Sequence, residues 1–150
     1  MPLDAFKLRE ASEEDLEFAY ELDKKLMKPY AELHIKWNED EQRRGFAKWF
    51  HQPHVMQIIE VAGKNAGVVC YSSRGDFFHI ESLELDSEFQ NLGIGSKILK
   101  LLITEARKHR FPVKLLVFKE NDRAISLYKK LGFEIVGEDL KEAKYYMRLE

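Results

Sequence analysis

The sequence has 150 residues, of which 45% are hydrophobic and 33% charged, the balance of an ordinary globular protein. This length suits one domain with a proper core, so we expect residues 1–150 to form a single domain. The formal net charge of −2 argues against a protein that mainly binds nucleic acid, because such binding depends on a basic face.

The sequence also indicates a compartment. Residues 1–4 lack the basic and apolar pattern of a secretion signal, and no apolar run approaches the ~20 residues that cross a bilayer. We therefore expect a cytoplasmic protein with no membrane partner. The single cysteine, Cys70, suits a reducing compartment, and its apolar neighbours favour a packed core residue over a nucleophile.

The first half of the chain predicts a strand, two helices and a hairpin. Apolar alternation over residues 6–9 predicts the strand, and Ser12 followed by acids predicts a helix that runs out near Pro29. Asn38 is the expected N-cap of the second helix. Two strands between residues 55 and 71 flank an expected turn at residues 63–65.

The second half alternates strands and helices. The patterns predict a strand over 77–85, a helix from Ile94, a strand over 113–117, a helix from Asn121 to Leu131 closed by Gly132, and strands over 133–136 and 145–149. This order predicts an α/β (α+β) fold, with a mixed sheet of about seven strands and helices on both faces.

Residues 88–97 join a strand to a helix and contain two glycines. The first N–H groups of a helix have no intrahelical partner, so this turn is suited to bind phosphate. A P-loop would need glycine at Gln90, and a dinucleotide fingerprint would need glycine at Ile98. Both alternatives are therefore excluded.

Two segments resemble one family. Gln90-x-x-Gly93-x-Gly95 resembles the Q/R-x-x-G-x-G/A signature of the GNAT acetyltransferase superfamily, and residues 121–133 resemble its N-x-x-A-x-x-L-Y-x-x-x-G-F signature. The resemblance implies the GNAT fold, with a mostly antiparallel sheet whose fourth and fifth strands splay apart. It also implies acetyl-CoA as co-substrate.

In that family the turn holds the pyrophosphate on backbone amides, and the pantetheine arm pairs with the fourth strand. Carried over by position, the expected coenzyme-binding residues are Leu83, Glu84, Leu85, Gln90, Asn91, Leu92, Gly93, Ile94, Gly95, Ser96 and Asn121.

The resemblance places Tyr128 at the position of the general acid that protonates the leaving sulfur. Strand alternation puts His79 and Glu81 on one face, and family members have a base or a water relay at either offset. The sequence favours Glu81 as the base, with an amine-binding role or an exposed acid as alternatives. Glu84 faces the other way, and its side chain is expected to be structural.

His51 and His54 have a spacing found in metal sites, but Pro53 breaks any helix between them. No cluster of cysteine or acidic residues completes a site, so we expect a loop and no metal.

The acceptor side is less constrained. Tyr30, Trp37 and neighbouring acids would suit a small cation, and Tyr146 on the last strand would reach the acceptor; packing of Tyr30 and Trp37 is the alternative. The resemblance implies an N-acetyltransferase that transfers the acetyl group to a primary amine of a small molecule or peptide by direct attack in a ternary complex. A catalytically weak CoA-binding sensor or interaction module is the second hypothesis. We expect a monomer or homodimer.

Overall fold

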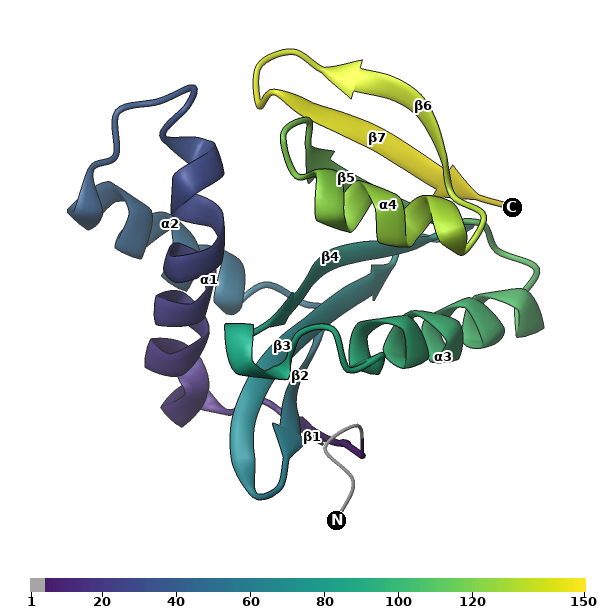
Figure 1. The fold of residues 1–150 in the computed structure, drawn as a ribbon, viewed down its shortest axis with the longest axis horizontal. Coiled ribbons are helices and arrows are strands. Elements are labelled where there is room, and N and C mark those ends of the chain that lie inside the picture. The colour runs from purple at the N-terminus through teal and green to yellow at the C-terminus, as the bar shows by residue number, and fades with distance from the viewer. Residues whose placement is uncertain (1–4) are drawn as a thin grey trace. The chain divides into compact units, whose positions relative to one another are not determined.

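A computed structural model describes residues 5–150 (Figure 1). Residues 1–4, where the sequence shows no secretion signal, lie outside the described residues. The strands are β1 (Lys7–Glu10), β2 (Val55–Val61), β3 (Lys64–Ser73), β4 (Phe78–Leu85), β5 (Val113–Phe118), β6 (Glu134–Asp139) and β7 (Lys144–Leu149). The α-helices are α1 (Leu16–Ala31), α2 (Glu39–Phe50), α3 (Ile94–Lys108) and α4 (Asp122–Lys130), and short 3₁₀ helices cover Glu13–Asp15 and Ser87–Phe89.

The strands are hydrogen-bonded in the order β1-β2-β3-β4-β5-β7-β6. Strands β4 and β5 pair in parallel, whereas the pairs β1–β2, β5–β7 and β6–β7 are antiparallel. The predicted mixed sheet and element order are therefore confirmed. Within residues 5–150, no helix is long and apolar enough to cross a membrane.

The chain divides into two compact units. The N-terminal unit comprises the chain up to Cys70 together with Ser82–Ile94, and the C-terminal unit comprises Tyr71–Glu81 together with Gly95–Glu150. Strand β4 contributes residues to both, with its first four residues in the C-terminal unit and its last four in the N-terminal unit.

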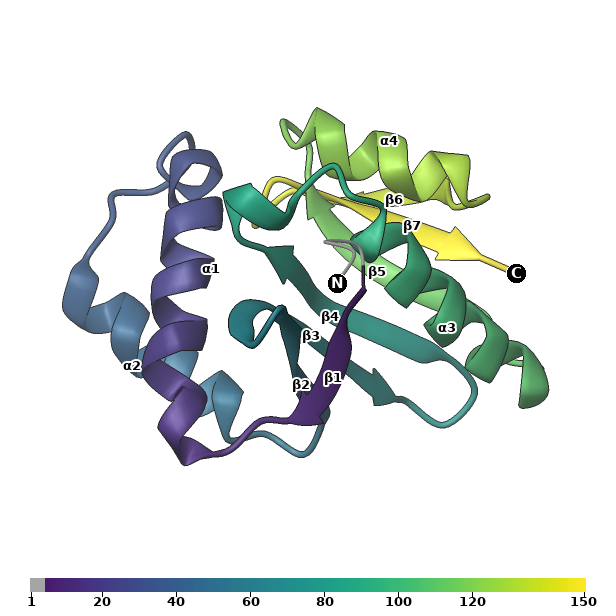
Figure 2. The same ribbon diagram turned by 60° about the horizontal axis from the view of Figure 1, so that its bottom comes forward.

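The core of the N-terminal unit lies where α1 and α2 pack on β2 and β3. Ala19 and Leu22 of α1 are buried in one cluster with Ile58 and Cys70. The aromatic residues Phe46, Trp49 and Phe50 of α2 pack against this cluster. Figures 1 and 2 both show α1 and α2 side by side. Cys70 has no exposed surface, which confirms it as a core residue.

Two local predictions in this unit are wrong. Helix α1 continues through Pro29 to Ala31. The proline lies in the last turn, where it removes only one N–H donor, and the N–H of Glu32 beyond it still donates to the carbonyl of Lys28. The hairpin turn is Ala62–Gly63, one residue earlier than predicted. Both residues have positive φ, +51° and +77°, as a two-residue type I′ turn requires.

The C-terminal unit contains the alternation expected of a half-buried sheet. Along β5, Val113, Leu115 and Val117 are buried while the residues between them are half-exposed. Helix α4 is capped by Asn121, whose side-chain oxygen accepts a hydrogen bond from the N–H of Ala124 at 3.3 Å. The pairing between β4 and β5 covers Phe78↔Val113, His79↔Lys114 and Ile80↔Leu115.

Candidate active site

The glycine turn has a backbone suited to an anion. Asn91 and Gly93 adopt left-handed conformations, with φ of 64° and 82°, and α3 begins at Ile94. Backbones that alternate in this way point successive N–H groups into one concavity, which binds anions. A Cβ at Gly93 would meet nothing within 4 Å, so the space beside this backbone is open. Gly95 and Ser96 lie in the first turn of α3, where N–H groups lack intrahelical partners.

Gln90 has a role that the motif alone does not reveal. Its side-chain Nε2 donates a hydrogen bond to the carbonyl oxygen of Leu85 at 2.7 Å. This bond ties the turn to the end of β4, where Leu83, Glu84 and Leu85 were predicted to meet the coenzyme. Gln90 therefore shapes the turn through its side chain, and Asn121 likewise uses its side-chain oxygen to cap α4.

Glu84 lies on the buried face of β4, as the alternation predicts, and is only 7% exposed. Burial raises the pKa of this carboxyl well above its usual range, and a hydrogen bond with Asp23 of α1 raises it further. Two carboxyl groups joined by a hydrogen bond must share a proton, and the raised pKa of Glu84 favours its protonated form. On the neighbouring strand β3, a Cβ on Gly67 would lie 2.2 Å from the backbone carbonyl oxygen of Glu84, so only glycine fits there.

His79 and Glu81 lie together on the half-exposed face of β4. His79 Nε2 is 4.0 Å from Glu81 Oε1, and the two side chains are 20% and 15% exposed. The other oxygen, Glu81 Oε2, accepts hydrogen bonds from the Ser72 hydroxyl at 3.1 Å and from Arg74 at 3.3 Å. Arg74 also donates to the Ser72 oxygen at 2.9 Å. The structure thus brings both sequence-predicted base candidates into one cluster.

This environment fixes the charges of the pair. Burial lowers the pKa of His79, and its neighbours Arg74 and Lys114 lower it further, outweighing the opposite effect of Glu81. Burial by itself would raise the pKa of Glu81, but the hydrogen bond from Ser72 and the nearby His79 and Arg74 hold it below the usual value. At neutral pH, His79 is therefore a neutral imidazole and Glu81 a carboxylate.

Tyr128 is the third predicted catalytic residue, and the structure places it on α4. It is 8% exposed, and its ring lies 5.6 Å from that of Phe133 in an edge-on arrangement. Packing therefore restricts the orientation of the phenol. A tyrosine this deeply buried needs a hydrogen-bonding environment for its hydroxyl, unlike the phenylalanine beside it.

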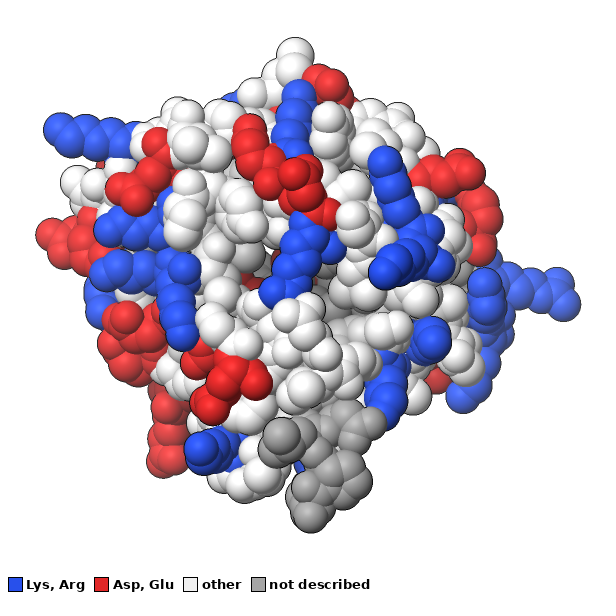
Figure 3. Space-filling model, in the orientation of Figure 1, with Lys and Arg blue, Asp and Glu red and all other residues white. Residues whose placement is uncertain are grey.

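Glu39, an acid near Trp37, is engaged within the chain. Glu39 accepts hydrogen bonds from the Tyr20 hydroxyl at 2.6 Å and from the Trp37 indole at 3.1 Å. Lys24 lies 2.7 Å from the same carboxylate, and Arg43 3.1 Å. The hydrogen bond from Lys24, with those from Tyr20 and Trp37, lowers the pKa of Glu39 to about 2. Figure 3 shows acidic and basic side chains interspersed over α1 and α2.

The expected acceptor residues therefore differ in availability. The Trp37 ring lies under Lys28, at 5.5 Å, and its indole is bound to Glu39, so it is held by structural contacts. Tyr30 is half-buried in the last turn of α1. Tyr146 is 43% exposed, on the same face of the C-terminal unit as Leu116, and its hydroxyl donates to Asp139 at 3.4 Å.

Comparisons with known proteins agree with this geometry. A sequence model of the acetyltransferase (GNAT) family matches residues 13–133. The chain belongs to the GNAT family. Within this family, the chain is 27% identical to a spermidine N(1)-acetyltransferase of Escherichia coli K12, over 91% of this chain and 76% of that protein.

Solved GNAT structures share the fold. The PaiA N-acetyltransferase of Thermoplasma acidophilum, in complex with coenzyme A, matches with a TM-score of 0.77 at 17% identity, covering 97% of this chain and 99% of that one. The ribosomal-protein-S18-alanine N-acetyltransferase of Escherichia coli matches with a TM-score of 0.71 at 21% identity, covering 97% and 93%.

Family membership confirms three predictions. The protein is an acyltransferase, its acyl donor is acetyl-CoA, and its fold is the GNAT fold. The open, left-handed backbone at Asn91 and Gly93 fits a pyrophosphate, since it offers N–H groups and requires no side chain. Within residues 5–150, no group of three or more His, Cys, Asp or Glu side chains is arranged to hold a metal ion.

Sequence reasoning missed the cations and the hydroxyl around the base candidates. Ser72 and Arg74 lie at and just beyond the end of β3, where the strand pattern gives no functional signal. Lys114 lies opposite His79 in the sheet register. It was visible as the polar position in an alternating strand, but only the register shows which residue it adjoins.

Proposed function

We propose that this GNAT protein is an N-acetyltransferase that transfers the acetyl group of acetyl-CoA to a primary amine of a small molecule or peptide, by direct attack in a ternary complex. The observation that carries the proposal is the neutral His79 beside the ionised Glu81 on the half-exposed face of β4. Acetyl-CoA supplies an activated thioester; the remaining task is to move protons.

His79 is the proposed proton acceptor. An alkylammonium has a pKa of about 10, so an attacking amine must lose a proton at neutral pH. A base works best when its pKa lies near the working pH, and His79 meets this condition better than Glu81, whose pKa lies below its usual value. The sequence favours Glu81, whereas the electrostatics of the structure favour His79. Glu81 then stabilises the imidazolium that forms when His79 takes the proton.

Tyr128 is the proposed general acid, which gives its hydroxyl proton to the departing sulfur. Its restricted phenol, on a helix capped by Asn121, supports this role, as does its place in the family signature. Backbone N–H groups of the turn from Asn91 to Ser96 are proposed to hold the pyrophosphate, and the backbone from Leu83 to Leu85 the pantetheine arm.

The named relatives support an amine acceptor. One is named for acetylation of spermidine and another for acetylation of an alanine of ribosomal protein S18. The match to residues 13–133 includes residues of both compact units, which supports the proposal that residues 1–150 form one domain. The cytoplasmic location stays a prediction from composition.

Binding and turnover together test the proposal. Acetyl-CoA should raise the melting temperature and should be consumed with at least one member of a panel of polyamines, amino acids, aminoglycosides and peptides. A raised melting temperature without turnover on any amine would favour the second hypothesis, a CoA-binding module. An unchanged melting temperature at millimolar acetyl-CoA would refute both functions.

The acid is tested by Tyr128→Phe, with Tyr145→Phe as the matched control. Tyr145 lies in the same unit, and its ring lies under Lys119, a contact that phenylalanine retains. We expect Tyr128→Phe to lower kcat by about 10²-fold or more while coenzyme affinity is kept. Equal turnover in the two variants would remove the acid role.

A further inference from the structure

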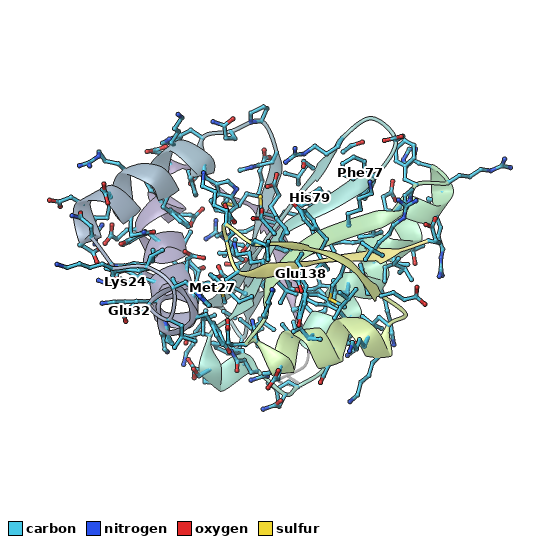
Figure 4. The ribbon with its side chains drawn as sticks, turned by 90° about the horizontal axis from the view of Figure 1, so that it is seen from above. Lys24, Met27, Glu32, Phe77, His79 and Glu138 are labelled. Atoms are coloured by element: carbon cyan, nitrogen blue, oxygen red, sulfur yellow. The ribbon has the colours of Figure 1, made fainter. Side chains whose placement is uncertain are left out.

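The face that carries His79 also carries a cation that no acid of its unit neutralises. Lys114 of β5 lies directly opposite His79 in the parallel register, about 4.8 Å away between strands. Its ammonium lies over the ring of Phe77, 4.1 Å from the centroid. Phe77 and His79 are two residues apart at the start of β4 (Figure 4). In the described part of the C-terminal unit, Lys114 makes no ion pair.

The other charges of this cluster are balanced. Arg74 and Glu81 form an ion pair at 3.3 Å, and Ser72 bridges them. Because His79 is neutral, Lys114 leaves the cluster with one excess positive charge. Burial is the main cause that lowers the pKa of His79, and the charges of Arg74 and Lys114 lower it further.

From this charge, and resting on the function proposed above, we propose that Lys114 selects acceptors that carry an anionic group beside their reactive amine. An amine that delivers its proton to His79 brings its neighbouring atoms close to Lys114. A carboxylate there gains the attraction of the ammonium, whereas a polyamine brings further positive charge and is repelled. The aromatic ring of Phe77 attracts the ammonium but cannot cancel its charge.

The proposed preference differs from the substrate named for the spermidine N(1)-acetyltransferase relative.

An anionic group beside an amine occurs in free amino acids and in peptides that begin with aspartate or glutamate. Two matched acceptor pairs separate these sources. The first pair is methionine and methionine amide, which differ in the α-carboxylate. The second is a peptide amide that begins with Asp and the same peptide that begins with Asn. Spermidine is the cationic comparison.

The experiment measures kcat/KM of the full chain for each acceptor. We expect the wild type to prefer the anionic member of at least one pair by about tenfold, the scale of a partly screened charge pair. Lys114→Met should reduce this ratio to near one and improve the use of spermidine, while Lys114→Arg should retain it. Lys100→Met, which removes a lysine from an exposed position of α3, should leave the ratio unchanged.

The outcomes are distinguishable. If amines are acetylated but Lys114→Met leaves the ratios unchanged, or the wild type prefers the anionic member of neither pair, or it prefers spermidine to both anionic acceptors, the role of Lys114 is refuted and the acetyltransferase function stands. If no amine is acetylated although acetyl-CoA binds, the proposed function fails and this inference fails with it. Equal melting temperatures for Lys114→Met and Lys114→Arg would exclude a folding defect as the cause of a changed ratio.

Discussion

The two faces of β4 hold carboxyl groups three residues apart in opposite states. Glu81, on the half-exposed face, receives hydrogen bonds from Ser72 and Arg74, and its pKa is lowered. Glu84, on the buried face, pairs with another carboxyl, and its pKa is raised. Burial favours the protonated form of both carboxyl groups; donors and positive charge outweigh it at Glu81, whereas the neighbouring carboxyl of Asp23 adds to it at Glu84. The half-exposed face carries the residues proposed for proton transfer, and the buried face carries a carboxyl that contacts α1.

The largest expected effect comes from the half-exposed face. His79→Gln removes the proposed base, so kcat/KM for the acceptor should fall by about 10²-fold or more, because a positioned base contributes on that scale. Steady-state kinetics measure the fall, and isothermal titration should show unchanged coenzyme affinity. His109→Gln is the control, since His109 is an exposed histidine of the same unit. Loss of activity in both variants, or in neither, would contradict the assignment.

A larger side chain at Gly67 tests how closely β3 and β4 pack beside Glu84. Replacing it with alanine puts a methyl group against the carbonyl of Glu84, so we expect the free energy of unfolding to fall by about 1–3 kcal/mol. Denaturant titration measures it. Gly45→Ala in α2 is the control, because nothing lies within 4 Å of the added group and a helical alanine is favoured by about 0.5–1 kcal/mol. Two variants of equal stability would mean that β3 and β4 tolerate a wider spacing.

The protonation of Glu84 predicts how stability depends on pH. A carboxyl whose pKa is raised on folding contributes fully below its unfolded value of 4.5, and this contribution is lost as the pH rises through the folded value. Over that window wild-type stability should fall, relative to Glu84→Gln, by up to about 1.4 kcal/mol for each pH unit. Urea titrations at about pH 5 and about pH 8, which sample the lower and upper parts of this pH range, measure the difference in the free energy of unfolding. Parallel profiles for the two proteins would show that Glu84 is ionised when folded.

The smallest expected effect is a shift of the pH profile when a charge beside His79 is removed. The charge of Glu81 raises the pKa of His79, and that of Arg74 lowers it. We expect the acidic limb of the kcat/KM profile to lie below pH 6.5, since the neutral imidazole is the active form. Glu81→Gln should move this limb to lower pH and Arg74→Met to higher pH, each by less than about one unit. Shifts in the same direction would show that another group titrates.

Much of the fold follows from the sequence because its signals are local. The cap at Asn121, the left-handed Gly132 and the apolar stripe of α3 each depend on neighbours within a few residues. The errors at Pro29 and Ala62 arose where the backbone departs from a residue's usual preference. An alanine at positive φ carries no sequence signal.

The candidate site also contains residues that local patterns predict and residues that they do not. The face of β4 that carries His79 and Glu81 follows from the two-residue period of a strand. The positions of Ser72, Arg74 and Lys114 depend on strand register, which joins residues far apart in the chain. The proposed choice of His79 over Glu81 as the base rests on these neighbours, because a pKa depends on neighbours in space.

The bond from Gln90 to the carbonyl of Leu85 also bears on how the enzyme discriminates between acyl donors. It anchors the turn proposed to bind the pyrophosphate to the strand end proposed to hold the pantetheine, so we expect the bound pyrophosphate to help position the acyl group. Because Asn91 and Gly93 already hold the required backbone conformation, little ordering is needed when a donor with that pyrophosphate arrives. A truncated thioester such as acetyl-pantetheine, which has the reactive bond but no pyrophosphate, would be a poor donor for this enzyme.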